Sequence, residues 1–194
     1  MMLSQLMQVQ AHANRLANLR LHTAMAPLTR EQLHAPRTSF FPSLIETLNH
    51  ILAVDRYYVG VLHRDADVDA GFWDRFVADD TLAPLAEKQR LVDERLIAWC
   101  DRHTDDADFD QPVAMPRDGG RFQRDRAGFM LQHLFMHQTH HRGQVHAMLS
   151  GTTIAPPQLD EFIMPSEPHL RLREMAALGW SEKAVYGKRL PPAR

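Results

Sequence analysis

Apolar residues recur at spacings of three and four over four long segments, a pattern typical of helices that bury one face. These segments cover residues 4–25, 39–63, 81–102 and 125–151. The second begins between residues 39 and 43, with Pro42 in its first turn, where proline is well tolerated. The fourth stops at Gly151, a residue type common just after helices. The pattern predicts an all-α fold, a four-helix bundle.

The second segment is apolar on two sides. Its main side carries mostly leucine and isoleucine, and the opposite side carries His50, Val54, Tyr57 and Val61. A helix with two apolar faces is expected to be covered on both. Asp55 interrupts the main side, and the favoured interpretation is a structural ion pair, with a first-helix group or an imidazole as partner.

The region before the fourth segment is irregular and contains the turn sequence Asp118-Gly119-Gly120. Such a turn predicts a short β-hairpin before the last long helix. After four prolines, a short helix is expected over residues 169–178. We therefore divide the chain into the bundle, residues 1–165, and residues 166–194. The second part is a short helix and tail that pack on, or extend from, the same domain.

Composition narrows the class of protein. The chain has 194 residues, a formal net charge of −2 and one cysteine. It is long enough for a single domain with its own core, and one cysteine excludes an internal disulfide. The charge argues against a strongly basic surface, so we expect no nucleic-acid partner. No apolar run reaches the ~20 residues of a membrane helix, and no secretory signal is visible, so we expect a cytoplasmic protein without membrane contact.

Histidine is the unusual component, with twelve residues, five of them between His133 and His146. His133, His137 and His141 are four residues apart and follow one side of the fourth segment. His137 and His141 point into the apolar sector. Neutral imidazole binds Zn²⁺, Ni²⁺ and Fe²⁺, and side chains one turn, or ~6 Å, apart can share one ion. All three would span ~12 Å, so a third ligand must come from elsewhere, and His50 is the best candidate.

Other interpretations of these residues stay open. A core histidine is often a neutral side chain hydrogen-bonded to a carbonyl, and the orientation of His50 is ambiguous by itself. The acidic loop from Asp65 lacks the acidic twelfth ligand of a calcium loop, because Phe76 occupies that place. The Glu31-x-x-His34 motif stands alone, whereas a di-iron bundle needs paired motifs.

Two runs of sequence resemble the signature of the DinB/YfiT-like family of metalloenzymes. They are residues 133–146, with the sequence HLFMHQTHHRGQVH, and residues 41–58. Residues 14–18 are similar to a first-helix pattern of that family, with Leu16 where the family has tryptophan, and residues 156–160 resemble its segment after the last helix. The resemblance extends to about residue 164.

The resemblance implies a divalent metal held by His50, His137 and His141. We expect zinc or nickel before iron or manganese. Relatives use low-molecular-weight thiols, which makes such a thiol a second expected cofactor, and they often form homodimers. We place His133 in the pocket above the metal as a tentative catalytic residue or indirect partner, since an imidazole beside a metal can carry protons near neutral pH.

Three functions fit these expectations. The first is an enzyme whose metal activates water or a thiol at an open position, an S-transferase or a hydrolase acting on an unknown small molecule. The second is a non-catalytic metal-binding or small-molecule-binding module of a stress response. The third is a structural helical dimer with a vestigial site. Near the site, Gln144 is expected to orient a histidine or fill a polar gap, and Arg142 to form an ion pair on the helix surface.

Overall fold

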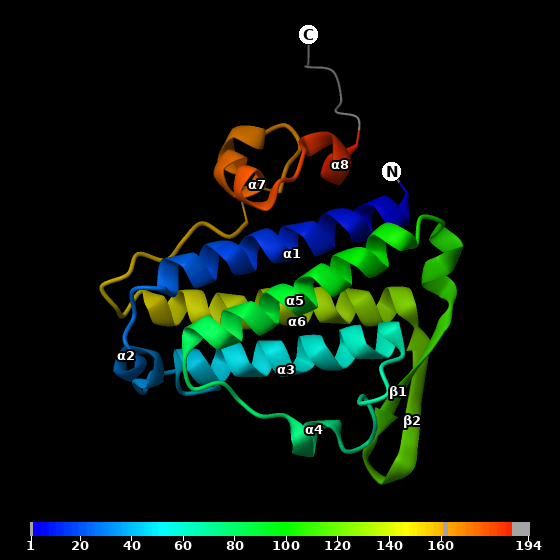
Figure 1. Ribbon diagram of the computed structural model, residues 1–194, viewed down its shortest axis with the longest axis horizontal. Coiled ribbons are helices and arrows are strands. Elements are labelled where there is room, and N and C mark those ends of the chain that lie inside the picture. Colours follow the sequence, from blue (N-terminus) through cyan, green and yellow to red (C-terminus); the bar gives the residue numbers. More distant parts are fainter. Residues whose placement is uncertain (1, 161–162, 188–194) are drawn as a thin grey trace.

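The computed structural model describes residues 2–160 and 163–187, and long helices dominate it (Figure 1). The long helices are α1 (Leu3–Met25), α3 (Leu44–His63), α5 (Leu82–Arg102) and α6 (Ala127–Leu149). Helix α1 packs along α5, and α3 contacts both α5 and α6. This arrangement confirms the predicted helical bundle. It places α3 against α6, the helix that carries five of the twelve histidines.

The start of α3 differs from the prediction. The helix begins at Leu44, and Pro42 lies outside it. Ser43 is the N-cap: its backbone is extended, and its hydroxyl accepts a hydrogen bond from the Glu46 amide at 3.3 Å. The same hydroxyl donates to the Glu46 carboxylate at 2.8 Å. The bond from the Glu46 amide satisfies one of the first-turn N–H groups that have no partner within a helix. Ser43, rather than Pro42, therefore marks where α3 starts.

The predicted hairpin is present between α5 and α6. Strands β1 (Pro112–Arg117) and β2 (Arg121–Arg126) pair antiparallel, and the short helix η2 (Asp118–Gly120) joins them. Gly119 and Gly120 have φ angles of 69° and 71°. Glycine reaches this left-handed region without a steric penalty, which is why the turn sequence was informative.

Both apolar faces of α3 are covered, as the pattern predicted. Tyr57 is fully buried on the second face, and its hydroxyl donates to the carbonyl of Pro116 in β1. Its ring also lies 5.0 Å from that of Trp73. The hairpin and the segment around Trp73 therefore supply this cover within the chain, and the two-sided pattern does not by itself require a second copy.

Shorter elements complete the described chain, and of these the sequence predicted only a helix near α7. They are α2 (Arg30–His34), α4 (Phe72–Arg75), η1 (Asp106–Asp110), η3 (Pro168–Leu170), α7 (Leu172–Leu178) and α8 (Glu182–Tyr186). Met175 of α7 and Tyr186 of α8 form a small apolar cluster with Leu16 of α1. The far end of the predicted tail, residues 188–194, lies outside the described residues.

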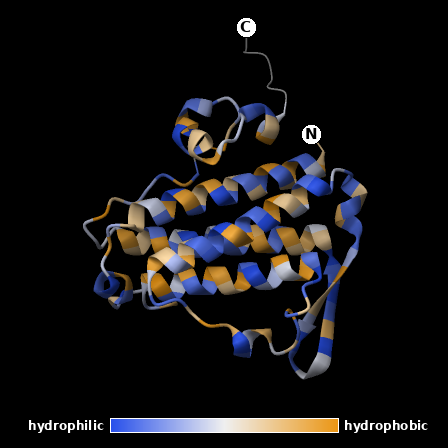
Figure 2. Ribbon diagram, viewed as in Figure 1, coloured by the Kyte–Doolittle hydropathy of each residue, from blue (hydrophilic) through white to orange (hydrophobic). Residues whose placement is uncertain are grey.

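The interior of the bundle is unusually polar. Figure 2 shows hydrophilic positions interspersed with hydrophobic ones along the long helices. The buried polar set includes Asn14, Asn18, Asp55, Gln89, Asp93, Gln138 and Arg142, contributed by all four long helices. Within the described residues, no helix combines the length and apolar character needed to span a membrane.

Candidate metal centre

Three histidines from two helices meet between α3 and α6. One ligand nitrogen from each of His50, His137 and His141 lies within 4.8 Å of the others. The Nε2 atoms of His50 and His137 are 2.9 Å apart. His137 and His141 project from successive turns of α6, while His50 comes from the facing side of α3. Helix packing thus brings together the residues that the sequence singled out.

The environment keeps all three imidazoles neutral. Burial, with a smaller contribution from the neighbouring His141, lowers the pKa of His50 to about 4. Burial and the adjacent histidines lower the pKa of His137 to about 3. Burial also lowers the pKa of His141, against the hydrogen bond that its ring donates to Gln144. A neutral imidazole has a nitrogen lone pair to offer, so the set is chemically ready to bind a cation at neutral pH.

Gln144 orients one of the three rings. The Nδ1 atom of His141 lies 2.7 Å from Oε1 of Gln144, which can only accept a hydrogen bond. The proton therefore resides on Nδ1, and Nε2 of His141 is left with its lone pair. The Gln144 amide nitrogen in turn lies 3.2 Å from Nε2 of His140. The expectation that Gln144 orients a histidine is confirmed.

The geometry fits a small divalent ion. Two nitrogens that each lie ~2.0–2.1 Å from one tetrahedral zinc ion stand about 3.3–3.4 Å apart, so the rings of His50 and His137, whose Nε2 atoms are 2.9 Å apart, need only a small shift to share an ion. Without an ion, a hydrogen bond between these two nitrogens uses one ring as donor and leaves the other ring's proton on its Nδ1. The Nδ1 atom of His137 is buried without a hydrogen-bond partner among the described residues. The rings are therefore held by packing in an arrangement that suits shared coordination.

An aromatic side chain that the sequence reasoning missed covers part of the centre. The ring of Phe41 lies 4.4 Å from that of His50 and 5.7 Å from that of His141. His50 and His137 are only partly buried, so the site is reachable from the surface. Phe41 precedes the N-cap Ser43, in a region that the helical pattern assigned to α3 itself, so the pattern gave no sign of this contact.

His133 lies outside the three-histidine group. It is exposed, and its ring centre is 6.3 Å from that of His137 and 5.4 Å from that of Tyr58. It therefore sits one turn from the nearest candidate ligand. Its tentative catalytic role stays a prediction.

A buried hydrogen-bond network lies next to the three histidines, and its α6 residues are about 100° around the helix from His137 and His141. Oδ1 of Asp93 accepts hydrogen bonds at 3.0 Å from Asn14, Asn18 and Gln89. Oδ2 of Asp55 accepts from Gln89 at 2.7 Å and from Gln138 at 3.0 Å. The network thus ties together all four long helices.

Two expectations about this network were wrong. Arg142 does not form a surface ion pair: it is buried and donates from Nη1 to the side-chain oxygens of Asn14 and Asn18. Asp55 is hydrogen-bonded to two glutamines rather than to a first-helix group or an imidazole. Burial and the nearby carboxylate of Asp93 raise its pKa to about 7. Position on one helix shows which residues share a side, but not which sides the bundle buries.

The other residues that the sequence offered for chemistry lie outside the three-histidine group. Cys100 is buried, and burial raises the pKa of its thiol to about 12, which makes it a poor nucleophile. In the acidic loop, Asp65 pairs with Arg95 at 2.7 Å and Asp69 with Arg75 at 2.7 Å. His34 contacts Asp80 at 3.1 Å, away from the three histidines.

Comparison with known proteins agrees with the resemblance seen in the sequence. The family model of the DinB family matches residues 2–169, which is most of the chain. A search of curated proteins finds no match to it. With the match extending over the four long helices and all three converging histidines, the chain belongs to the DinB family.

Proposed function

We propose that this protein is a metal-dependent enzyme in which His50, His137 and His141 hold one divalent ion. The observation that carries the proposal is the convergence of three neutral imidazoles, with two Nε2 atoms 2.9 Å apart, at a partly exposed position. Three protein ligands leave a coordination position for water or substrate, which is typical of catalytic rather than structural sites. The proposed reaction class is thiol transfer or hydrolysis.

Each residue near the centre has a defined part in this proposal. When bound, a divalent ion supplies Lewis acidity and lowers the pKa of a water or thiol at the open position. Gln144 holds the His141 ring in the ligating tautomer, and Phe41 excludes water from one side. His133, exposed and one turn away, is the proposed proton carrier. Zinc or nickel suits an all-imidazole ligand set better than manganese, which favours oxygen ligands.

A second function is metal binding without turnover. Among the described residues, no carboxylate makes a hydrogen bond or ion pair with His50, His137 or His141, so the three rings lack the acidic partner that commonly supports metal-binding histidines. A binding module needs no such group, and a stress-response role would fit it. The two functions differ in whether the open position accepts a substrate.

Two measurements test the proposal. Elemental analysis of protein purified without a histidine tag is expected to find about one divalent ion per chain. The protein is then loaded with Co²⁺ and titrated with 2-mercaptoethanol, and the visible absorption of the cobalt is expected to change as sulfur binds. No bound metal would reject the enzyme and the binding module alike. A stoichiometric metal with an unchanged cobalt spectrum would reject the thiol chemistry and leave hydrolysis.

A further inference from the structure

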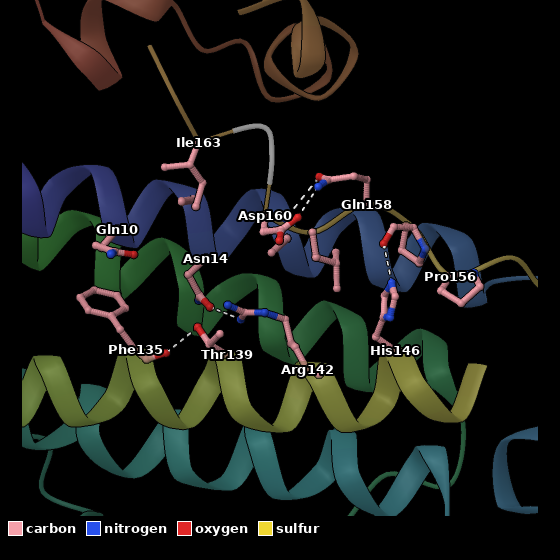
Figure 3. Close-up of a pocket in the computed structure, with 15 residues that line it drawn as sticks. Gln10, Asn14, Phe135, Thr139, Arg142, His146, Pro156, Gln158, Asp160 and Ile163 are labelled. Carbon is pink, nitrogen blue, oxygen red and sulfur yellow. Dashed lines mark hydrogen bonds between the residues drawn. The ribbon is translucent and has the colours of Figure 1, made fainter. Parts of the chain in front are cut away.

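A cavity of about 580 Å³ lies between α1 and α6 on the side away from the three histidines. The segment after α6 closes its third side, with Pro156 to Asp160 across from α1 (Figure 3). His146 holds that segment in place, because its Nε2 atom lies 3.1 Å from the carbonyl oxygen of Pro157. The volume is within the range of small-molecule sites, which are commonly ~300–1,000 Å³.

The lining of the cavity is mostly apolar, with a single buried cation. The apolar part consists of Ala13, Ala17, Phe135, Leu159 and Ile163. Arg142 enters from α6 and reaches toward Asn14 of α1 (Figure 3). An apolar pocket with a few convergent polar groups is the usual form of a ligand site, in which the polar groups fix the orientation of the ligand.

One edge of the Arg142 guanidinium is uncommitted. Its hydrogen bonds within the described chain all leave from Nη1, toward Asn14 and Asn18. Nε and Nη2 have no hydrogen-bond partner among the described residues. They do not belong to the fully buried side-chain atoms that lack a partner, so both keep some exposure to solvent. These two donors therefore remain accessible on a residue that lines the cavity.

That edge is suited to a carboxylate. Nε–H and Nη2–H of arginine point in one direction and match the two oxygens of a carboxylate. The same chain uses this geometry in Arg90, whose Nε and Nη2 donate to the two oxygens of Glu87 at 2.8 and 2.6 Å. Arg142 presents the same two donors, with no carboxylate of the described chain on them.

The charges around Arg142 favour an anion. Arg15 and Arg142 are both buried near the carboxylates of Asp55 and Asp93. Burial raises the pKa of both acids, that of Asp55 to about 7, which weakens the negative charge that Asp55 sets against the two guanidiniums at neutral pH. Asp160, which is exposed at the opening, adds one negative charge there and disfavours ligands with two.

We propose that this cavity is a second binding site, separate from the metal centre, for a small organic monocarboxylate with an apolar body. The carboxylate accepts two hydrogen bonds from Nε and Nη2 of Arg142, and the apolar body packs against Phe135 and the alanines of α1. The site does not depend on the proposed metal chemistry, because none of the three histidines lines it.

The test uses the full chain and isothermal titration calorimetry with 4-phenylbutyrate and its neutral amide, 4-phenylbutanamide. The carboxylate is expected to bind roughly tenfold more tightly or better, since charge-assisted, bidentate hydrogen bonds are about twice as strong as neutral ones. Equal affinities for the two probes would overturn the proposal.

Gly143→Leu tests the location. Gly143 lines the cavity, and a Cβ atom added there meets nothing within 4 Å, so the backbone has room for a side chain, and we expect that of leucine to occupy part of the cavity. We expect it to weaken binding of 4-phenylbutyrate by about tenfold or more. Ala147→Leu is the matched control, because Ala147 is exposed one turn later on α6 and does not line the cavity. Equal affinity in the two variants would place the probe elsewhere.

A third arm separates this site from the metal centre, because a carboxylate could also bind a metal ion. In the His137→Ala variant, treated with chelator, binding of 4-phenylbutyrate is expected to persist within about twofold. Loss of binding there would assign the probe to the metal and overturn the proposal. A chain that binds no metal at all, but keeps this binding, would reject the proposed enzyme and leave the second site intact.

Discussion

The bundle contains two polar clusters, the hydrogen-bond network around Asp93 and the three histidines, and they differ in how their polar atoms find partners. In the network around Asp93, amide donors from α1 and α5 meet a carboxylate oxygen, so most of its polar atoms are partnered within the chain, the buried oxygens Asp55 Oδ1 and Gln138 Oε1 excepted. In the three-histidine cluster, Nε2 of His50 faces Nε2 of His137, and at most one of the two can donate. The first cluster is completed mainly by protein atoms, which suits a structural role. The second has lone pairs left over, which suits an added cation.

Burial favours the uncharged form of acidic and basic groups alike in this bundle. It lowers the pKa of His137 to about 3 and raises that of Asp55 to about 7, and in both cases the neutral form gains. For the histidines the neutral form is the ligating one. For the aspartate the neutral form limits the electrostatic cost of placing two carboxylates near each other.

The largest expected effect is loss of metal from the histidine cluster. His137→Ala and His141→Ala should each reduce bound metal from about one ion per chain to near zero in protein purified without a tag, because two imidazoles rarely retain an ion. Elemental analysis measures this. His140→Ala is the control: His140 neighbours His141 but does not belong to the converging group, so it should keep its metal. Full metal content in both ligand variants would reject the assignment.

The second-largest expected effect is a loss of stability when the buried network is broken. Asp93→Ala should lower the free energy of unfolding by ~3–5 kcal/mol, because three buried amides lose their shared acceptor and two nearby guanidiniums lose a negative charge. Glu94→Ala, an exposed change at the next position of α5, should cost less than ~1 kcal/mol. Urea denaturation measures both. Similar values would mean that the network is not a source of stability.

The pH dependence of stability is the third prediction. The pKa of Asp55 is about 7 in the folded protein and 3.8 in an unfolded chain, so between these values the folded state holds the extra proton. Its contribution to stability is therefore present at pH 4 and is lost as pH rises toward 7, by up to ~1.4 kcal/mol per pH unit. Asp55→Asn should remove this slope.

The measurement for Asp55 is urea denaturation from pH 4.5 to 7.5 with chelator present. Contributions from the histidines occur in both proteins and cancel in the difference between wild type and variant. The exposed change Asp67→Asn should follow the wild type throughout. A constant difference between wild type and Asp55→Asn would show that the carboxyl of Asp55 does not titrate in this range.

The smallest expected effect concerns the support of one ligand. Gln144→Ala removes the acceptor of the His141 Nδ1 proton and should weaken metal binding by ~10–100-fold without abolishing it. Competition with a chromophoric chelator measures the affinity. Gln132→Ala, at an exposed position of the same helix, should leave the affinity unchanged. An unaltered affinity in Gln144→Ala would show that packing alone orients the ring.

Much of the fold was predictable, because long amphipathic helices carry a strong periodic signal and the glycine turn marks the hairpin. Prediction was weaker where a local contact sets the boundary, as the hydroxyl of Ser43 does at the start of α3. Short elements such as α2 and α4 are one or two turns long and leave no periodicity to detect.

The candidate site was predictable to the extent that it depends on one helix. His137 and His141 share a side of α6 by spacing alone, whereas His50 was the best remaining candidate with an ambiguous orientation, because its helix is apolar on two sides, and the family resemblance singled it out. The buried role of Arg142 was not predictable. It lies about 100° from His141, and the sequence does not show that α1 and α3 cover α6 from different directions.

Neighbouring positions of α6 have different partners in the bundle, and this limits where the chain can gain or lose a residue. His137 and His141 face α3 with their rings, while Gln138 and Arg142, each one residue later, serve the buried network, Gln138 through Asp55 of α3 and Arg142 through Asn14 of α1. A single inserted residue between His137 and His141 would turn everything after it by about 100°, so that the ring of His141 would take the place of the Arg142 guanidinium in the network and its own place would fall to His140. The connecting loops can absorb insertions and deletions, but this stretch of helix has to keep its register.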